Sequence, residues 1–171
     1  VTTMIMGNCG FSLAPLSDDA AAREEVVKIF SFFEDFPEAP FFSELPWDWK
    51  TWSEYSDSMK QKTRVPLNYG AFVGHIALRL AVMGIEAWER SATSSEIEQM
   101  VVLLEDALKS GALGISTNLL DHDGEDRPIP SLMADDKEFL AIFDCVSKFP
   151  GTTVQVVIDS IMRMTAVPAM E

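Results

Sequence analysis

Short apolar runs alternate with longer segments of helical periodicity along this chain, and this alternation constrains the fold more than any other feature. Each run has the length and composition of a buried strand, and there are four of them: Thr2–Met6, Val65–His75, Leu113–Thr117 and Thr152–Ile158. Strands separated by helices pair in parallel through right-handed crossovers. The sequence therefore predicts an α/β protein with a parallel sheet.

The most clearly marked helix starts at a capping box, Thr93-Ser94-Ser95-Glu96. Apolar residues follow at helical spacing until Gly111 ends the pattern: Ile97, Met100, Val101, Leu104, Ala107 and Leu108. Similar patterns predict three further helices, from a cap at Ser17 or Asp18 to about Phe33, from Trp49 to Met59, and from Asp136 to Lys148. In the last helix we expect four residues to face the core: Phe139, Ile142, Phe143 and Val146.

Composition and charge exclude several classes of partner. The net charge is −14, whereas phosphate binding needs an excess of Lys and Arg, so we expect no nucleic acid and no anionic membrane as a partner. No apolar run approaches the roughly 18 residues of a membrane span. The two cysteines lie far apart and do not indicate a disulfide framework, which favours a reducing, cytoplasmic location.

A turn with the sequence Gly7-Asn8-Cys9-Gly10 ends the first apolar run and brings a thiol to the carboxyl end of a strand. That end of a parallel sheet is where α/β proteins keep their chemistry. The flanking glycines allow close backbone approach, so the thiol can face a pocket. The alternative is an inert cysteine in a tight turn. The spacing alone favours this alternative, because free cysteines are among the most buried residues.

Residues 1–15, VTTMIMGNCGFSLAP, closely resemble the second barrel strand of the D-aminoacylase (N-acyl-D-amino-acid deacylase) family of amidohydrolases. Three later stretches resemble the same family in the same order: Trp49–Trp52, Asn68–Arg79 and Gly111–Thr117. The resemblance implies a TIM-like (β/α) barrel, a zinc cofactor and hydrolysis of a non-peptide C–N bond. The implied substrate is an N-acyl-D-amino acid or a related small amide.

The length of the chain is that of a piece of such a barrel. A complete (β/α) barrel needs about 250 residues, whereas this chain has 171 and starts inside a strand, without the segment in which the family carries a His-x-His metal pair. We therefore interpret residues 1–171 as a single fragment, about half of an amidohydrolase barrel, and expect it to be inactive in isolation. Its outer strands would lack neighbours, so we also expect it to self-associate or to pack against the rest of a longer chain.

Each predicted strand end presents polar residues toward one face of the implied barrel: Cys9, His75, Ser116 with Thr117, and Gln155 or Asp159. The resemblance implies that Cys9 is a zinc ligand, and we expect the side chain of His75 to converge on it. The alternative for His75 is a histidine that only forms hydrogen bonds within the core. We expect four residues to contact the substrate: His75, Ser116, Thr117 and Gln155.

Two departures from the family indicate a divergent branch. The family ends the strand equivalent to Thr152–Ile158 with a zinc-binding histidine, whereas this chain has Gln155 and no histidine there. The sequence Asn118-Leu119-Leu120-Asp121 replaces the family's Gly-Leu-x-Tyr. The following Asp121-His122-Asp123 cluster is either a metal site or a set of turn formers, and we favour turn formers. The alternative function is a pseudo-enzyme module that contributes only packing and association.

Residues 34–62 form an insertion rich in aromatic residues and proline. Prolines at positions 37, 40 and 46 interrupt any regular ladder, so we expect neither helix nor strand between Glu34 and Trp49. The aromatic side chains either line a pocket for an acyl substrate or pack the loop onto the barrel rim. We favour packing, because aromatic residues usually anchor cores and interfaces.

Overall fold

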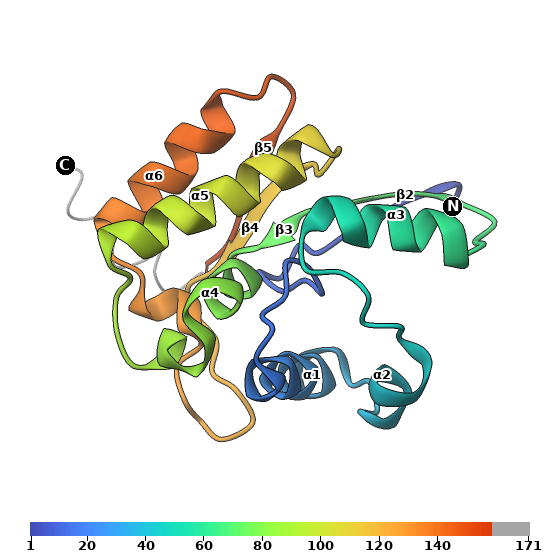
Figure 1. Ribbon diagram of the computed structural model, residues 1–171, viewed down its shortest axis with the longest axis horizontal. Coiled ribbons are helices and arrows are strands. Elements are labelled where there is room, and N and C mark those ends of the chain that lie inside the picture. The colour runs from blue at the N-terminus through green and yellow to red at the C-terminus, as the bar shows by residue number, and fades with distance from the viewer. Residues whose placement is uncertain (159–171) are drawn as a thin grey trace.

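The strands of the computed structural model, which describes residues 1–158, all pair in parallel (Figure 1). Strand β1 (Thr3–Met6) pairs with β2 (Asn68–Ala71), and β3 (Val73–Gly74), β4 (Gly114–Asn118) and β5 (Thr153–Val157) form a second sheet in that order. Only Phe72 separates β2 from β3, and the Leu113 amide donates to the Ala71 carbonyl at 2.9 Å. The two sheets therefore adjoin in one open layer. This confirms the predicted parallel α/β class, and the described strands do not close into a barrel.

Six α-helices and two short 3-10 helices connect the strands within residues 1–158. The helices are α1 (Ala20–Glu34), α2 (Ala39–Glu44), α3 (Trp52–Lys62), α4 (His75–Met83), α5 (Ser94–Lys109) and α6 (Asp136–Ser147). The 3-10 helices are η1 (Gly84–Trp88) and η2 (Pro130–Met133). None of these helices is long and apolar enough to cross a bilayer.

Side-chain caps fix where the helices begin. The predicted capping box at Thr93 and Glu96 is present, and α3 starts with a second box made by Thr51 and Glu54. The prediction for α1 was wrong by one to two residues, because the side chain of Asp19, not of Ser17 or Asp18, accepts from the Ala21 amide. The predicted start of α3 at Trp49 was also wrong, because the box begins the helix at Trp52.

Two further expectations about helices were wrong. The segment from Glu34 to Trp49 is not wholly irregular: α2 occupies part of it, with a proline in the first turn, where the missing amide is tolerated. In α6, Ile142 and Val146 are buried as predicted, whereas Phe143 is exposed and Cys145 and Glu138 are buried in its place.

The predicted strand Val65–His75 is shorter than expected and ends at Gly74. Gly74 lies directly against the turn that carries Cys9: a Cβ atom there would lie 2.6 Å from the Gly10 carbonyl oxygen. The chain changes direction at this contact, and the Ile76 amide donates to the same oxygen at 3.3 Å. His75 is therefore the first residue of α4 and not a residue of a strand.

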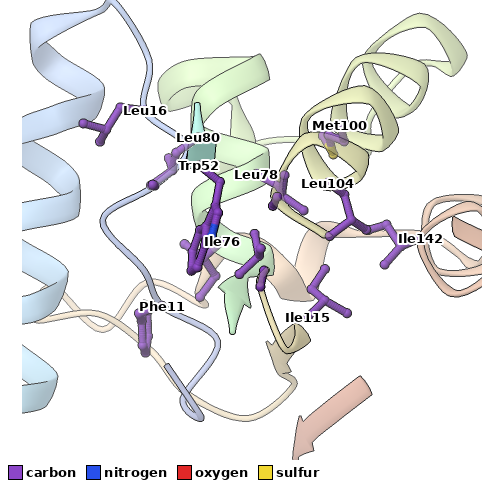
Figure 2. Packing of buried hydrophobic residues seen from close by; sticks show 14 of the residues in the cluster. Phe11, Leu16, Trp52, Ile76, Leu78, Leu80, Met100, Leu104, Ile115 and Ile142 are labelled. Atoms are coloured by element: carbon purple, nitrogen blue, oxygen red, sulfur yellow. The ribbon is translucent and has the colours of Figure 1, made fainter. Parts of the chain in front are cut away.

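The core lies between the sheet and the helices α4, α5 and α6. Figure 2 shows its centre, where Ile76, Leu78 and Leu80 of α4 meet Met100 and Leu104 of α5, Ile115 of β4 and Ile142 of α6. The outer strands are covered less well: Met4 and Ile5 of β1 and Val154 and Val156 of β5 are exposed. Self-association through these edges stays a prediction.

Candidate functional site

The turn that carries Cys9 is clamped against the carboxyl ends of the neighbouring strands. The Gly10 amide donates to the Ser116 hydroxyl at 3.2 Å, and the Asn118 side-chain amide donates to the Cys9 carbonyl at 3.2 Å. Gly10 has a φ of +87°, and a Cβ atom on it would lie 2.9 Å from the Cβ atom of Asn118. Only glycine fits this contact, which holds the cysteine at the edge where active sites of parallel sheets lie.

The thiol of Cys9 lines a cavity of about 420 Å³ together with Glu34, the last residue of α1. Burial raises the pKa of this thiol to about 11, and the neighbouring Glu34 carboxylate adds to the effect. The thiol is therefore protonated at neutral pH. A cation bound beside these two groups would favour the thiolate, which is the form that binds metals.

The donor chemistry at this turn suits zinc, but the number of donors does not complete a site. A thiolate and a carboxylate are both zinc ligands, whereas a catalytic zinc needs three protein ligands. Within residues 1–158 no group of three or more His, Cys, Asp or Glu side chains is arranged to hold a metal. The described residues therefore account for part of a metal site at most.

His75 lies in a buried network that connects three elements of the fold. Its Nε2 atom lies 2.7 Å from a carboxylate oxygen of Glu138 on α6, and its Nδ1 atom lies 2.9 Å from the Thr117 hydroxyl on β4. Arg79, one turn further along α4, forms a buried ion pair with the same carboxylate and also donates to the carbonyls of Ala87 and Arg90. His75, Arg79 and Glu138 have no exposed surface.

The protonation states in this network follow from burial and charge. Burial opposes ionisation of Glu138, but the His75 and Arg79 donors outweigh it and hold the pKa of Glu138 below its usual value. Burial lowers the pKa of His75, with the Glu138 carboxylate acting in the opposite direction. Neutral His75 then donates from Nε2 to Glu138 and accepts from the Thr117 hydroxyl at Nδ1. Both ring nitrogens are thus engaged within the chain.

The expected convergence of Cys9 and His75 was wrong. Both residues follow strands at the same edge of the sheet, but Cys9 faces the cavity beside α1, whereas His75 faces Glu138 of α6 and does not line that cavity. The physical reason is the Arg79–Glu138 ion pair, because Glu138 holds the imidazole of His75 toward α6. The geometry matches the alternative in which His75 forms hydrogen bonds within the core.

The other predicted contact residues occupy different environments. Ser116 and Thr117 are buried, the first bonded to the Gly10 amide and the second to His75. Gln155 lies beside Ser116 on β5, and its buried side-chain oxygen has no hydrogen-bond partner among residues 1–158. Asp159 lies outside the described residues.

Within the Asp121-His122-Asp123 cluster, Asp123 is a turn former, as we favoured: it precedes the turn at Gly124 and Glu125, whereas His122 forms an isolated antiparallel bridge with Pro128. One Asp123 oxygen accepts from the backbone amides of Glu125 and Arg127, and the other accepts from the Arg127 side chain at 2.7 Å. The side chain of His122 is largely exposed, and its Nδ1 atom lies 2.9 Å from the Asp123 carbonyl.

Neutral, buried His75 should make stability depend on pH below the ordinary histidine pKa of 6.5. Because its pKa is lowered in the folded state, the unfolded state binds more protons there, and the free energy of unfolding should fall as the pH drops from 7 toward 5. Urea unfolding at several pH values measures this. In His75→Asn the dependence over this interval should flatten, and an equally steep dependence in that variant contradicts the assignment.

Asn118→Gly should loosen the turn that carries Cys9. Asn118 is buried, and besides the Cys9 carbonyl its side chain bonds Asp121 and the Leu120 amide. We expect unfolding to cost about 1–3 kcal/mol less and the Cys9 thiol to react faster with a disulfide reagent. The control is Asn68→Gly, an exposed residue of β2, which should leave thiol reactivity unchanged. Unaltered reactivity in Asn118→Gly contradicts the role of the clamp.

Comparison with known proteins connects this geometry with an enzyme family. A D-aminoacylase from Alcaligenes xylosoxydans xylosoxydans is 38% identical over 120 residues, which are 68% of the chain and 21% of that protein. An N-acyl-D-glutamate deacylase from the same organism is 34% identical over 126 residues, which are 72% of the chain and 22% of that protein. The chain is homologous to the D-aminoacylase family of amidohydrolases. It spans about a fifth of the length of these curated relatives, and no protein-family model matches it.

Solved D-aminoacylase structures resemble the fold over most of the chain. One, described as defining a novel subset of amidohydrolases, has a TM-score of 0.61 at 31% identity and covers 88% of this chain and 27% of its own. The N-acyl-D-glutamate deacylase of Bordetella bronchiseptica, complexed with zinc and a phosphonate inhibitor, has a TM-score of 0.60 at 26% identity and covers 86% of this chain and 26% of its own. Another D-aminoacylase structure is described by its binuclear metal centre. The D-aminoacylase homologues of this chain are therefore metal-dependent hydrolases.

Proposed function

We propose that this D-aminoacylase homologue forms part of the active site of a zinc-dependent amidohydrolase that cleaves the amide of an N-acyl-D-amino acid. The observation that carries the proposal is the clamped Cys9 turn at the carboxyl edge of a parallel sheet, beside a cavity that also contains Glu34. A relative named D-aminoacylase that is 38% identical to the chain supports the substrate class.

Cys9 is the proposed metal ligand from this chain. When bound, zinc supplies an acidified water and polarises the scissile carbonyl. The chain itself holds the thiol in place through Ser116 and Asn118, and Glu34 lies beside it as a further anionic group. The remaining ligands and the acid–base residue are proposed to lie outside residues 1–158.

Gln155 is a proposed substrate contact, because one of its side-chain atoms forms no hydrogen bond with the described residues. Its side-chain oxygen is buried without a partner among residues 1–158 and can accept a hydrogen bond from an amide N–H of the substrate. Direct substrate contact by His75, Ser116 and Thr117 stays a prediction, and all three are engaged in hydrogen bonds within the chain. A cytoplasmic location also stays a prediction.

The test compares the isolated 171 residues with the full-length, zinc-loaded protein that contains them. We expect the full-length protein to hydrolyse N-acetyl-D-leucine, to lose this activity with a chelator and to regain it with zinc, and to leave N-acetyl-L-leucine intact. The isolated chain should show no zinc-dependent turnover, because its described residues do not complete a metal site. Turnover by the isolated chain contradicts the proposal that residues outside 1–158 complete the metal site. A full-length protein that hydrolyses no amide favours the pseudo-enzyme alternative.

A further inference from the structure

The cavity beside Cys9 has an apolar wall that the metal chemistry does not explain. Its aromatic lining comes from five segments of the chain: Phe11, Phe30 of α1, Phe36, Trp52 and Tyr55 of α3, and Phe72 between β2 and β3. Its polar groups include Cys9 and Glu34, and none of the described residues that line it is a lysine or an arginine. A cavity of about 420 Å³ with this lining is typical of a site for an apolar small molecule.

A second cavity of about 230 Å³ adjoins the first between α3 and β2. Both are lined by Met6, Trp52, Tyr55 and Ala71, so the two share one wall. Tyr55 lines both cavities, and burial raises the pKa of its hydroxyl. The space that begins at Cys9 therefore extends away from the thiol past Trp52 and Tyr55 into a second cavity whose lining also includes Ser56, Lys60 and Ser110.

The position of this space relative to Cys9 determines which part of a substrate it can take. In an N-acyl-amino acid the carbon that is attacked belongs to the acyl group, and the acyl chain is bonded directly to it. A cavity that begins at a metal ligand is therefore placed for the acyl chain, whereas the amino-acid side chain starts two bonds further away, beyond the amide nitrogen.

We propose that this cavity binds the acyl chain of the substrate and selects uncharged apolar acyl groups, either aromatic or of medium length. This inference rests on the proposed function. Glu34 is the specificity-determining residue, because its carboxylate repels an acyl chain that ends in a second carboxylate; none of the described residues that line the first cavity is basic, and Lys60 lies in the second cavity. Burial of the acyl chain against the aromatic wall supplies the favourable energy.

The test measures kcat/KM of the full-length, zinc-loaded protein for D-leucine carrying an acetyl, butanoyl, hexanoyl or succinyl group on nitrogen. From acetyl to hexanoyl we expect about a fourfold gain for each added methylene. The succinyl substrate should be at least about tenfold poorer than the butanoyl substrate. Equal values for acetyl and hexanoyl overturn the proposal while leaving the proposed function intact.

Two variants test whether the preference among acyl groups arises from this cavity. Phe36→Ala should flatten the dependence on acyl length, whereas Phe42→Ala, an exposed phenylalanine of α2 outside the cavity, should keep it. Glu34→Gln should raise the succinyl-to-butanoyl ratio about tenfold. A ratio reports on the pocket even where the variant lowers both rates, and an unchanged ratio overturns the role of Glu34.

A direct binding measurement separates failure of the pocket from failure of the proposed function. If the protein hydrolyses no N-acyl-D-amino acid, the proposed function is wrong, and titration with N-hexanoyl-D-leucine still tests the cavity through tryptophan fluorescence, to which Trp52 of the cavity wall contributes. Saturable quenching in the wild type that weakens in Phe36→Ala but not in Phe42→Ala supports the pocket. No saturable binding overturns it as well.

Discussion

Glu138→Ala should lower the free energy of unfolding by about 3–5 kcal/mol, because it leaves the buried Arg79 guanidinium without its counter-ion. The same change removes the acceptor of the His75 Nε2 proton. One carboxylate thus connects α4 with α6, and urea unfolding of the variant measures what that connection contributes.

Two comparisons make this prediction specific. Glu98→Ala, at an exposed position of α5, should change stability little. Combining Glu138→Leu with Arg79→Met should recover part of the loss, because apolar residues of similar volume can replace a buried pair. A Glu138→Ala protein as stable as Glu98→Ala would show that the pair does not hold the two helices together.

Elements with a local chemical signal could be predicted from the sequence. Thr93 and Glu96 formed the capping box that the sequence specifies, because both partners lie within one helical turn. The parallel order of the strands followed from their alternation with helices. Cys9 could be assigned to a strand end because a β-branched run stops at two glycines, one of which the structure requires at a φ of +87°.

The parts that could not be predicted depend on contacts between distant residues. The apolar residues before His75 predict that it ends a strand, whereas the close approach of Gly74 to Gly10 makes it the first residue of a helix. Glu138 lies in the first turn of α6, where an acidic residue usually indicates only a favourable helix start. It pairs with Arg79, 59 residues earlier, and no sequence pattern near either residue indicates this pairing.

Glu34 and Asn118 were missed for different reasons. Glu34 stood at the edge of the aromatic segment, and only the fold brings the end of α1 to the thiol. For Asn118 the signal in the sequence is its replacement of the glycine that the family has at this position. Its role depends on the hydrogen bond that its side-chain amide donates to the Cys9 carbonyl, and only the fold brings these two groups together.

Cys9→Ser should abolish both metal binding and amide hydrolysis in the full-length protein. A serine hydroxyl is a much weaker zinc ligand than a thiolate, so the site loses a ligand while the turn keeps its hydrogen bonds through Ser116 and Asn118. The free energy of unfolding without metal should stay close to that of the wild type. Cys145→Ser is the matched control, because Cys145 is a free cysteine buried on α6, away from the cavity.

The zinc content per protein molecule, measured for wild type, Cys9→Ser and Cys145→Ser purified in parallel, tests the account most directly. We predict stoichiometric zinc in the wild type and in Cys145→Ser, and loss of stoichiometric zinc together with hydrolysis of N-acetyl-D-leucine in Cys9→Ser. A Cys9→Ser protein that keeps its zinc and its turnover would contradict the assignment of the Cys9 turn to the metal site.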